Sequence, residues 1–136
     1  MVDSVSRSER SEIMRRVRAK DTGPEMRVRR LVHGMGYRYR LHDRSLPGTP
    51  DLVLRRLRKI IFVHGCFWHR HARCAFSRLP KSRSEFWVPK LEGNRLRDRR
   101  NLARLRRAGW DVLVIWECEI ADLPCLGKRI RGFLDA

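Results

Sequence analysis

The stretch that organises the chain spans residues 60–74 and reads Ile60-Ile61-Phe62-Val63-His64-Gly65-Cys66-Phe67-Trp68-His69-Arg70-His71-Ala72-Arg73-Cys74. Its first four residues are apolar, which predicts a short buried strand. Three histidines, two cysteines, two adjacent aromatic residues and two arginines follow within eleven residues. Such side chains can hold a metal ion, move protons, stack on bases and bind phosphate. We therefore expect the functional site at the end of this strand.

The composition around this stretch favours a nucleic-acid partner. The chain has 136 residues and a formal net charge of +17, and its length predicts one domain, residues 1–136. Arginine suits phosphate because its planar guanidinium donates two parallel hydrogen bonds. Aromatic residues interleaved with this charge favour nucleic acid over a merely solubilising surface or adhesion to anionic lipid. No apolar run approaches the ~20 residues of a membrane span, so we expect a soluble, cytoplasmic protein.

The N-terminal half contains two helix-start patterns. A capping box at residues 6–9 predicts a helix over residues 7–19, within a basic N-terminal arm (residues 1–20) that carries Arg15 and Arg16. A second box at residues 22–25 predicts another helix, ended by Gly34 and Gly36. Alternating apolar residues then predict a strand over residues 37–41, and further strands are expected over 51–54 and 59–63.

The C-terminal half predicts a long helix and a fourth strand. Residues 66–84 have no clear period and indicate a loop-rich excursion. Ser84 would cap a helix that runs to about Arg107, with Leu91, Leu105 and Asp98 on one face. Residues 110–116 read as a buried strand and residues from 124 as a terminal helix. The expected fold class is therefore α/β, with a mixed sheet between helices and with sites where its strands end.

Two cysteines that bracket a histidine predict a structural zinc site. Cys66, His71 and Cys74 have the ligand types and close spacing of a closed zinc site. Cys118 is preferred as the fourth ligand because it follows a strand, with Cys125 as the competitor. The opposing interpretation is that the cysteines are buried small residues.

A second set of residues indicates phosphodiester hydrolysis. Asp51 at a strand start would hold Mg²⁺, and His64 and His69 would serve as acid and base. Each has a simpler structural interpretation: a turn cap for Asp51, a core hydrogen bond for His64 and a zinc ligand for His69. Glu25 is by default a capping-box glutamate. Asp98 is by default a buried ion-pair partner for one of three basic residues, namely Arg27, Arg29 or Arg95.

Two aromatic pairs complete the candidates, Phe67 with Trp68 and Phe86 with Trp87. Core packing is the simpler interpretation of either pair. The alternative is a wedge between base pairs, because aromatic stacking returns ~1–3 kcal/mol per base against an unstacking cost of a few kcal/mol.

The ordered motifs of the chain resemble one family, the very-short-patch-repair (Vsr) DNA mismatch endonucleases. The matching segments are Met14-Arg15, residues 20–25, residues 46–51, residues 62–71, residues 85–87, Asn94 with Asp98-Arg99, Gly109-Trp110 and residues 116–118. They occur in the order typical of that family and cover nearly the whole chain. The string from His64 to His69 is the most specific of them.

This resemblance implies a restriction-endonuclease-like (PD-(D/E)xK-type) three-layer α/β/α fold and a Mg²⁺-dependent nick 5′ to the thymine of a T:G mismatch that arises from 5-methylcytosine deamination. Double-stranded DNA is then the partner of a monomer, with other mismatch-repair proteins as further candidates. The implied roles distribute as follows: catalysis by Asp51, His64, His69, Glu25 and Asp98; Mg²⁺ at Asp51; zinc at Cys66, His71, Cys74 and Cys118; and DNA contacts by Phe67, Trp68, Trp87, Arg15, Arg16 and Arg70.

One departure from the restriction-type pattern stands out. The acid-x-lysine element usual on the next strand is replaced by Phe62-Val63-His64. Val63 stands where some relatives have threonine, so a metal contact there would use its backbone carbonyl. Two other functions stay open: a nuclease of the same fold with relaxed mismatch or restriction-type specificity, and a non-catalytic zinc protein that binds bent DNA.

Overall fold

The computed structural model describes residues 22–75 and 83–136, and the predicted helix over residues 7–19, with Arg15 and Arg16, lies outside them. In chain order the elements are α2 (Gly23–Gly34), β1 (Arg40–Leu41), β2 (Leu52–Leu54), β3 (Lys59–His64), α3 (Ser84–Arg107), β4 (Asp111–Trp116), the 3-10 helix η2 (Glu117–Ala121) and α4 (Leu123–Asp135). Within these described parts, no helix combines the length and apolarity needed to cross a bilayer.

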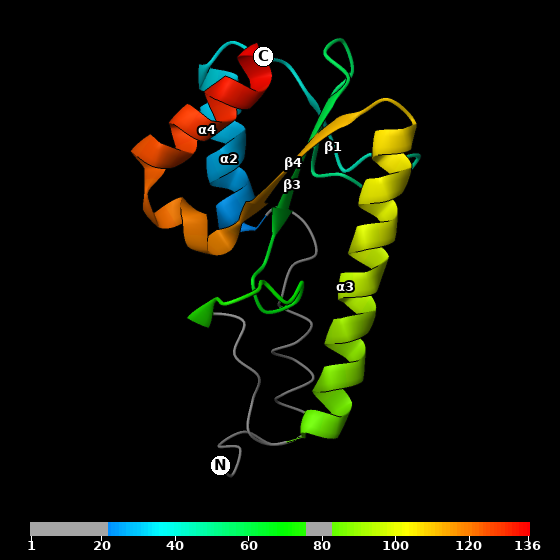
Figure 1. Cartoon of the computed structure of the whole chain (residues 1–136). Coiled ribbons are helices and arrows are strands. Elements are labelled where there is room, and N and C mark those ends of the chain that lie inside the picture. Colours follow the sequence, from blue (N-terminus) through cyan, green and yellow to red (C-terminus); the bar gives the residue numbers. More distant parts are fainter. Residues whose placement is uncertain (1–21, 76–82) are drawn as a thin grey trace.

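The sheet is mixed, as predicted from the order of the elements. Its strand order is β1-β2-β3-β4, with β1/β2 and β2/β3 antiparallel and β3/β4 parallel. Helix α3 connects the two parallel strands, since a parallel pair needs a long crossover. Figure 1 shows α2 and α4 on one face of the sheet and α3 on the other. The layers are therefore α/β/α.

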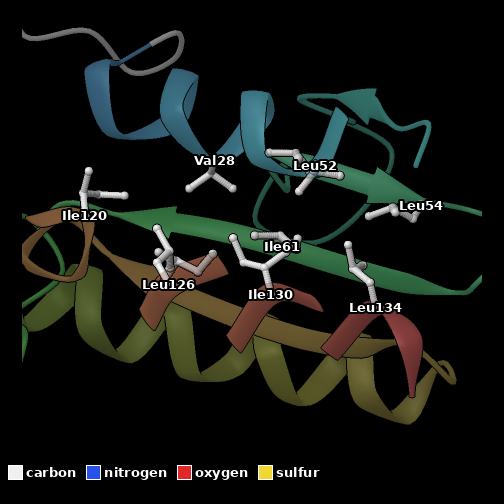
Figure 2. Packing of buried hydrophobic residues seen from close by; sticks show 10 residues of the cluster. Val28, Leu52, Leu54, Ile61, Ile120, Leu126, Ile130 and Leu134 are labelled. Atoms are coloured by element: carbon white, nitrogen blue, oxygen red, sulfur yellow. The ribbon is translucent and has the colours of Figure 1, made fainter. Parts of the chain in front are cut away.

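Two apolar clusters hold these layers together. The larger one joins α2 and α4 to one face of β2, β3 and β4 (Figure 2); its buried members are Val28, Val32, Leu52, Leu54, Ile61, Ile115, Ile120, Leu126, Ile130 and Leu134. The smaller one lies beneath α3 and contains Val53, Ile60, Phe62, Leu105 and Trp110. Consecutive residues of β2 and β3 thus belong to opposite clusters, because side chains alternate across a strand. A strand buried on both faces explains the continuous apolar run at residues 60–63.

The helix ends follow local sequence rules with one exception. The Thr22 side chain accepts a hydrogen bond from the Glu25 backbone nitrogen at 3.3 Å, which confirms the cap of α2. Helix α3 ends at Arg107 before Gly109, whose φ of +91° favours glycine. The prediction that Ser84 caps α3 was wrong: Ser84 is its first residue, and the N-cap is Arg83 in the left-handed region.

The predicted strand over residues 37–41 is reduced to Arg40–Leu41. The tyrosines before it contact the helices instead. The hydroxyl of Tyr37 bonds to Asp135 on α4, and that of Tyr39 donates to the Arg29 carbonyl oxygen at 3.4 Å. Side-chain packing therefore determines the path of this segment, and only its last two residues join the ladder.

Candidate active site and metal cluster

The parallel pairing of β3 and β4 creates the edge at which the site forms. His64 and Trp116 are paired at the ends of their strands. Cys66 and Cys118 each follow two residues later, so the in-register strands bring the two cysteines to one place. The carboxylate of Glu117 accepts a hydrogen bond from the Cys66 backbone nitrogen at 3.1 Å and ties the two strand ends together.

The turn after β3 returns two further side chains to this edge. The backbone nitrogen of His69 donates to the Gly65 carbonyl oxygen at 3.1 Å, and that of His71 donates to the Cys66 carbonyl oxygen at 2.9 Å. The His71 ring then stacks on Trp116, with centroids 4.1 Å apart and planes 9° from parallel. Asn94 of α3 donates to the Trp68 carbonyl oxygen at 3.1 Å and holds the turn from the other side.

Cys66, His71, Cys74 and Cys118 converge as predicted. Each offers one ligand atom, and these four atoms lie within 4.8 Å of one another. Cys125, the alternative fourth ligand, is exposed on α4 and is not in this cluster. Burial raises the pKa of the Cys66 thiol to about 12 and also raises the pKa of Cys118. Three sulfur atoms and one imidazole are a donor set that fits zinc.

Asp51 lies beside β3 and contacts its backbone. Its Oδ2 accepts a hydrogen bond from the Val63 nitrogen at 2.7 Å. Burial raises the pKa of Asp51 to about 7; the Val63 hydrogen bond opposes this rise, and the nearby charge of Glu25 adds to it. A partly buried carboxylate next to a second one suits a hard divalent cation such as Mg²⁺.

The turn before Asp51 depends on a glycine. Gly48 has a φ of +79°, and a Cβ there would lie 3.2 Å from the Phe62 ring and 3.2 Å from the Asn101 amide. Any other residue would be strained in its backbone and would press on β3 and α3. The glycine therefore lets the turn approach closely enough to place Asp51 next to Val63.

His64 and His69 stack in parallel, with ring centroids 3.9 Å apart and planes 6° from parallel. The Nδ1 atom of His69 lies 2.6 Å from Oδ2 of Asp98 on α3. This contact replaces the predicted ion pair of Asp98 with an arginine, because the turn after β3 passes over the middle of α3. His69 is absent from the Cys/His cluster and lies instead in a separate group with His64 and Asp98.

His64 is the more enclosed of the two histidines. Burial lowers its pKa to about 3, with the neighbouring His69 charge acting in the same direction. Its Nδ1 is buried, and no hydrogen-bond partner for it occurs among the described residues. The interpretation of His64 as a core residue held by a hydrogen bond at that atom is therefore not supported.

Glu25 is almost fully buried, with an exposed fraction of 1%. Its Oε2 lies 2.6 Å from Arg29 and 2.8 Å from Nε2 of His42. His42 was not predicted as a site residue. The signal that could have identified it is the β1–β2 pairing. Arg40 and Leu41 pair with Val53 and Leu52, so the next residue, His42, falls opposite Asp51.

Most of the candidate catalytic residues, but not Glu25, line one cavity of about 630 Å³ between the sheet edge and α3. Its walls include Asp51, His64, His69, Asp98 and His42. Arg44 also lines it and adds a cationic group that the sequence did not single out. The cavity is therefore lined by carboxylates, imidazoles and a guanidinium.

The aromatic residues form one cluster next to this cavity. The rings of Phe67, Trp68 and Trp87 contact one another edge to face, with centroids 5.2–5.9 Å apart. Trp87 has an exposed fraction of 7%, whereas that of Phe86 is 46%. Trp87 is thus the buried member that packs against Phe67 and Trp68. The predicted contact of Trp87 with DNA requires its ring to become exposed. Arg70 in the same turn has its Nε 3.5 Å from Glu92.

Comparison with known proteins identifies related sequences. Residues 2–75 match the family described as DNA mismatch endonuclease Vsr. A Xanthomonas oryzae protein named type II nicking enzyme V.XorIIP is 51% identical over 99% of this chain and 98% of its own. DNA mismatch endonuclease Vsr of Escherichia coli K12 is 44% identical over 88% of this chain and 76% of its own.

A solved structure supports the same architecture. The catalytic domain of homing endonuclease I-Bth0305I superposes with a TM-score of 0.56 at 25% identity, over 83% of this chain and 94% of that one. A nuclease domain thus shares the layers that surround the cavity. Taken with the matched sequence, this shows that the chain belongs to the Vsr family of DNA mismatch endonucleases.

Proposed function

We propose that the chain nicks one strand of double-stranded DNA 5′ to the thymine of a T:G mismatch, as arises when 5-methylcytosine is deaminated. One observation carries this proposal: Asp51 lines the same cavity as the hydrogen-bonded pair of His69 and Asp98. The aromatic residues Phe67 and Trp68 lie in the turn that carries His69. A carboxylate for a cation, an oriented base and a stacking surface are the three parts that mismatch-directed hydrolysis needs. The family match supports the assignment.

His69 is the general base in this proposal. An ionised Asp98 can only accept hydrogen bonds, so it holds the Nδ1 proton of His69 and leaves Nε2 free to take a proton from water. The water oxygen then forms a bond to phosphorus, the P–O3′ bond breaks, and the 3′ oxygen leaves with a proton supplied by solvent. His64 lies flat against His69 and keeps its ring in place.

Asp51 provides the anionic ligand for Mg²⁺, with the Val63 backbone carbonyl as a second ligand. The ion, when bound, neutralises the phosphate and lowers the pKa of a coordinated water. Asp51 itself is held for this role by the hydrogen bond from the Val63 nitrogen. Glu25 adds negative charge from the first turn of α2.

The Cys66, His71, Cys74 and Cys118 cluster serves as a structural zinc site. Four protein ligands leave no open position for chemistry. Zinc binding at such sites is on the order of 10 kcal/mol, which is ample to order an irregular turn. That turn carries Phe67, Trp68 and Arg70, so zinc would make the DNA-contacting surface rigid before DNA binds.

A nuclease of broader specificity is the second candidate, because several relatives carry the name type II nicking enzyme. The assembled His69–Asp98 pair disfavours a non-catalytic DNA-binding protein, which has no use for an oriented base.

Mapping the nick tests the proposal. Duplexes with one T:G pair, labelled on either strand and incubated with Mg²⁺, should be cut on the thymine strand alone, directly 5′ to the thymine. Cleavage of both strands or at scattered positions would contradict it.

A further inference from the structure

His42 occupies a position that the sheet itself assigns. It follows β1 directly, and its backbone nitrogen donates to the Asp51 carbonyl oxygen at 3.2 Å. This bond continues the antiparallel pairing in which Leu41 faces Leu52. His42 is therefore placed opposite Asp51 by the same ladder that forms the sheet.

The side chain of His42 lies beside the carboxylates of Glu25 and Asp51. Its Nε2 lies 2.8 Å from Oε2 of Glu25. One ligand atom each of Glu25, His42 and Asp51 lies within 4.8 Å of the other two. These three residues come from α2, from the end of β1 and from the start of β2, so the tertiary fold brings them together.

The charges of the residues around His42 favour binding of a cation. Two carboxylates face each other, and Arg29 balances one of them through its 2.6 Å contact with Glu25. In this structure Nε2 of His42 donates to Glu25. In the other neutral tautomer, with the proton on Nδ1, Nε2 offers a lone pair without adding charge. Once both carboxylates are ionised, a divalent ion would meet one negative charge that Arg29 does not balance, together with three donor atoms.

The nitrogen atom changes which ion suits the site. Mg²⁺ prefers an all-oxygen shell with near-ideal octahedral geometry. First-row divalent ions bind sites that mix nitrogen and oxygen, with Mn²⁺ at the weak end of that series. We propose that His42 supplies an imidazole nitrogen to the cation site of Asp51 and Glu25, so that the site of this chain binds Mn²⁺ in preference to Mg²⁺. This inference rests on the proposed function, in which Asp51 is a cation ligand, and assigns to His42 a role that the family resemblance does not supply.

Electron paramagnetic resonance of the zinc-loaded protein with added Mn²⁺ tests this directly, without DNA. Bound Mn²⁺ should show the electron spin-echo modulation of a coordinated imidazole ¹⁴N. The signature should disappear in His42→Gln, whose amide can still donate a hydrogen bond to Glu25. It should persist in the control His33→Gln, an exposed histidine in the last turn of α2.

Titration gives the second readout. His42→Gln should weaken Mn²⁺ binding at least roughly tenfold and should reduce the ratio of Mn²⁺ to Mg²⁺ affinity. An imidazole signature that survives in His42→Gln, or its absence from the unmodified protein, would overturn the proposal and leave His42 as a hydrogen-bond partner of Glu25. Loss of the signature in His69→Gln instead would place the ion beside Asp98, which also contradicts it.

These results are independent of whether the protein cuts at T:G. Failure to nick T:G duplexes, with the ¹⁴N signature intact and sensitive to His42→Gln, would refute the proposed function and leave the cation site. Mg²⁺-dependent nicking at T:G, with no ¹⁴N signature, would refute the role of His42 as a ligand and leave the proposed function.

Discussion

Nδ1 of His69 lies 2.6 Å from Oδ2 of Asp98, although the two residues are 29 positions apart in the chain. The turn after β3 supplies the imidazole and the middle of α3 supplies the carboxylate. Both side chains are partly exposed to the cavity, with exposed fractions of 30% for His69 and 23% for Asp98. A partly exposed pair is accessible to substrate while the carboxylate orients the ring.

Asp98→Asn should therefore reduce nicking by about 100-fold, the lower end of what an oriented base contributes. The amide no longer selects the tautomer with a free Nε2. Single-turnover nicking and DNA affinity should be measured together, because affinity is expected to change little. The matched control is Asp111→Asn, an exposed acid at the start of β4. Equal rates for the two variants would exclude a role for Asp98 through His69.

Cys74→Ser should remove the metal and lower stability. Loss of one of four ligands opens the site, and the turn that carries Phe67 and Trp68 loses its cross-link. Metal analysis and thermal unfolding of the purified protein check this, with Cys125→Ser as the control because Cys125 is exposed outside the cluster. A folded, unmodified protein with less than about half an equivalent of zinc would contradict the structural zinc site.

Asp51→Asn should abolish nicking and yet stabilise the protein in magnesium-free buffer at pH 8. The folded-state pKa of Asp51, about 7, is raised above its ordinary value near 3.8. The group's contribution to stability is therefore fully present below about pH 3.8 and is lost as pH rises through 7. Asparagine avoids that loss, so its melting temperature should exceed that of the unmodified protein by roughly 5 °C at pH 8, or about 1–2 kcal/mol. Equal melting temperatures for Asp51→Asn and the unmodified protein at pH 8 would show that Asp51 is not desolvated.

Lys59→Met should destabilise the fold without involving the cavity. The buried ammonium donates to the carbonyl oxygens of Phe133, Leu134 and Ala136 at 2.5–3.2 Å and caps the end of α4. Its loss leaves these acceptors without their donor and should cost about 2–4 kcal/mol in the free energy of unfolding. Denaturant unfolding measures this, and Arg56→Met in the exposed β2–β3 turn is the control. A cost below that of Arg56→Met would contradict the capping role.

Trp68→Ala should slow nicking at T:G because it raises the activation free energy by the ~1–3 kcal/mol of one lost stacking interaction. It should also lower the ratio of the nicking rate at T:G to the rate at T:A. A mismatched step costs less to open, so a stacking wedge converts that difference into selectivity. Trp68→Phe retains an aromatic face and should recover most of the preference, while zinc content stays unchanged in both variants. If Trp68→Ala retains full rate and full preference, the ring is part of the packing alone.

The sequence predicted the features that depend on local spacing. The caps and glycines around residues 22–36, the helix from 84 to 107 and the cluster of Cys66, His71, Cys74 and Cys118 were all readable from it. The cluster was accessible because three of its ligands lie within nine residues, and the fourth, Cys118, follows a recognisable strand. Strand ends in a mixed sheet then bring them together.

Contacts that depend on how elements cross were not predictable. The face of α3 that carries Asp98 was recognised, but the loop that passes over it was not, so its partner was assigned to an arginine instead of His69. His42 and Lys59 were missed for the same reason. Nothing in their local sequence distinguishes them, and each acquires its role from a residue brought close by the sheet or by α4.

The rate of nicking at T:G relative to T:A tests the central claim most directly. Duplexes identical except for that pair, with randomised flanking bases, should be compared in single-turnover reactions with Mg²⁺. The proposed function predicts a rate at least roughly tenfold higher for T:G, with cuts 5′ to the thymine. Equal rates on the two duplexes, or no cut in any sequence context, would contradict it.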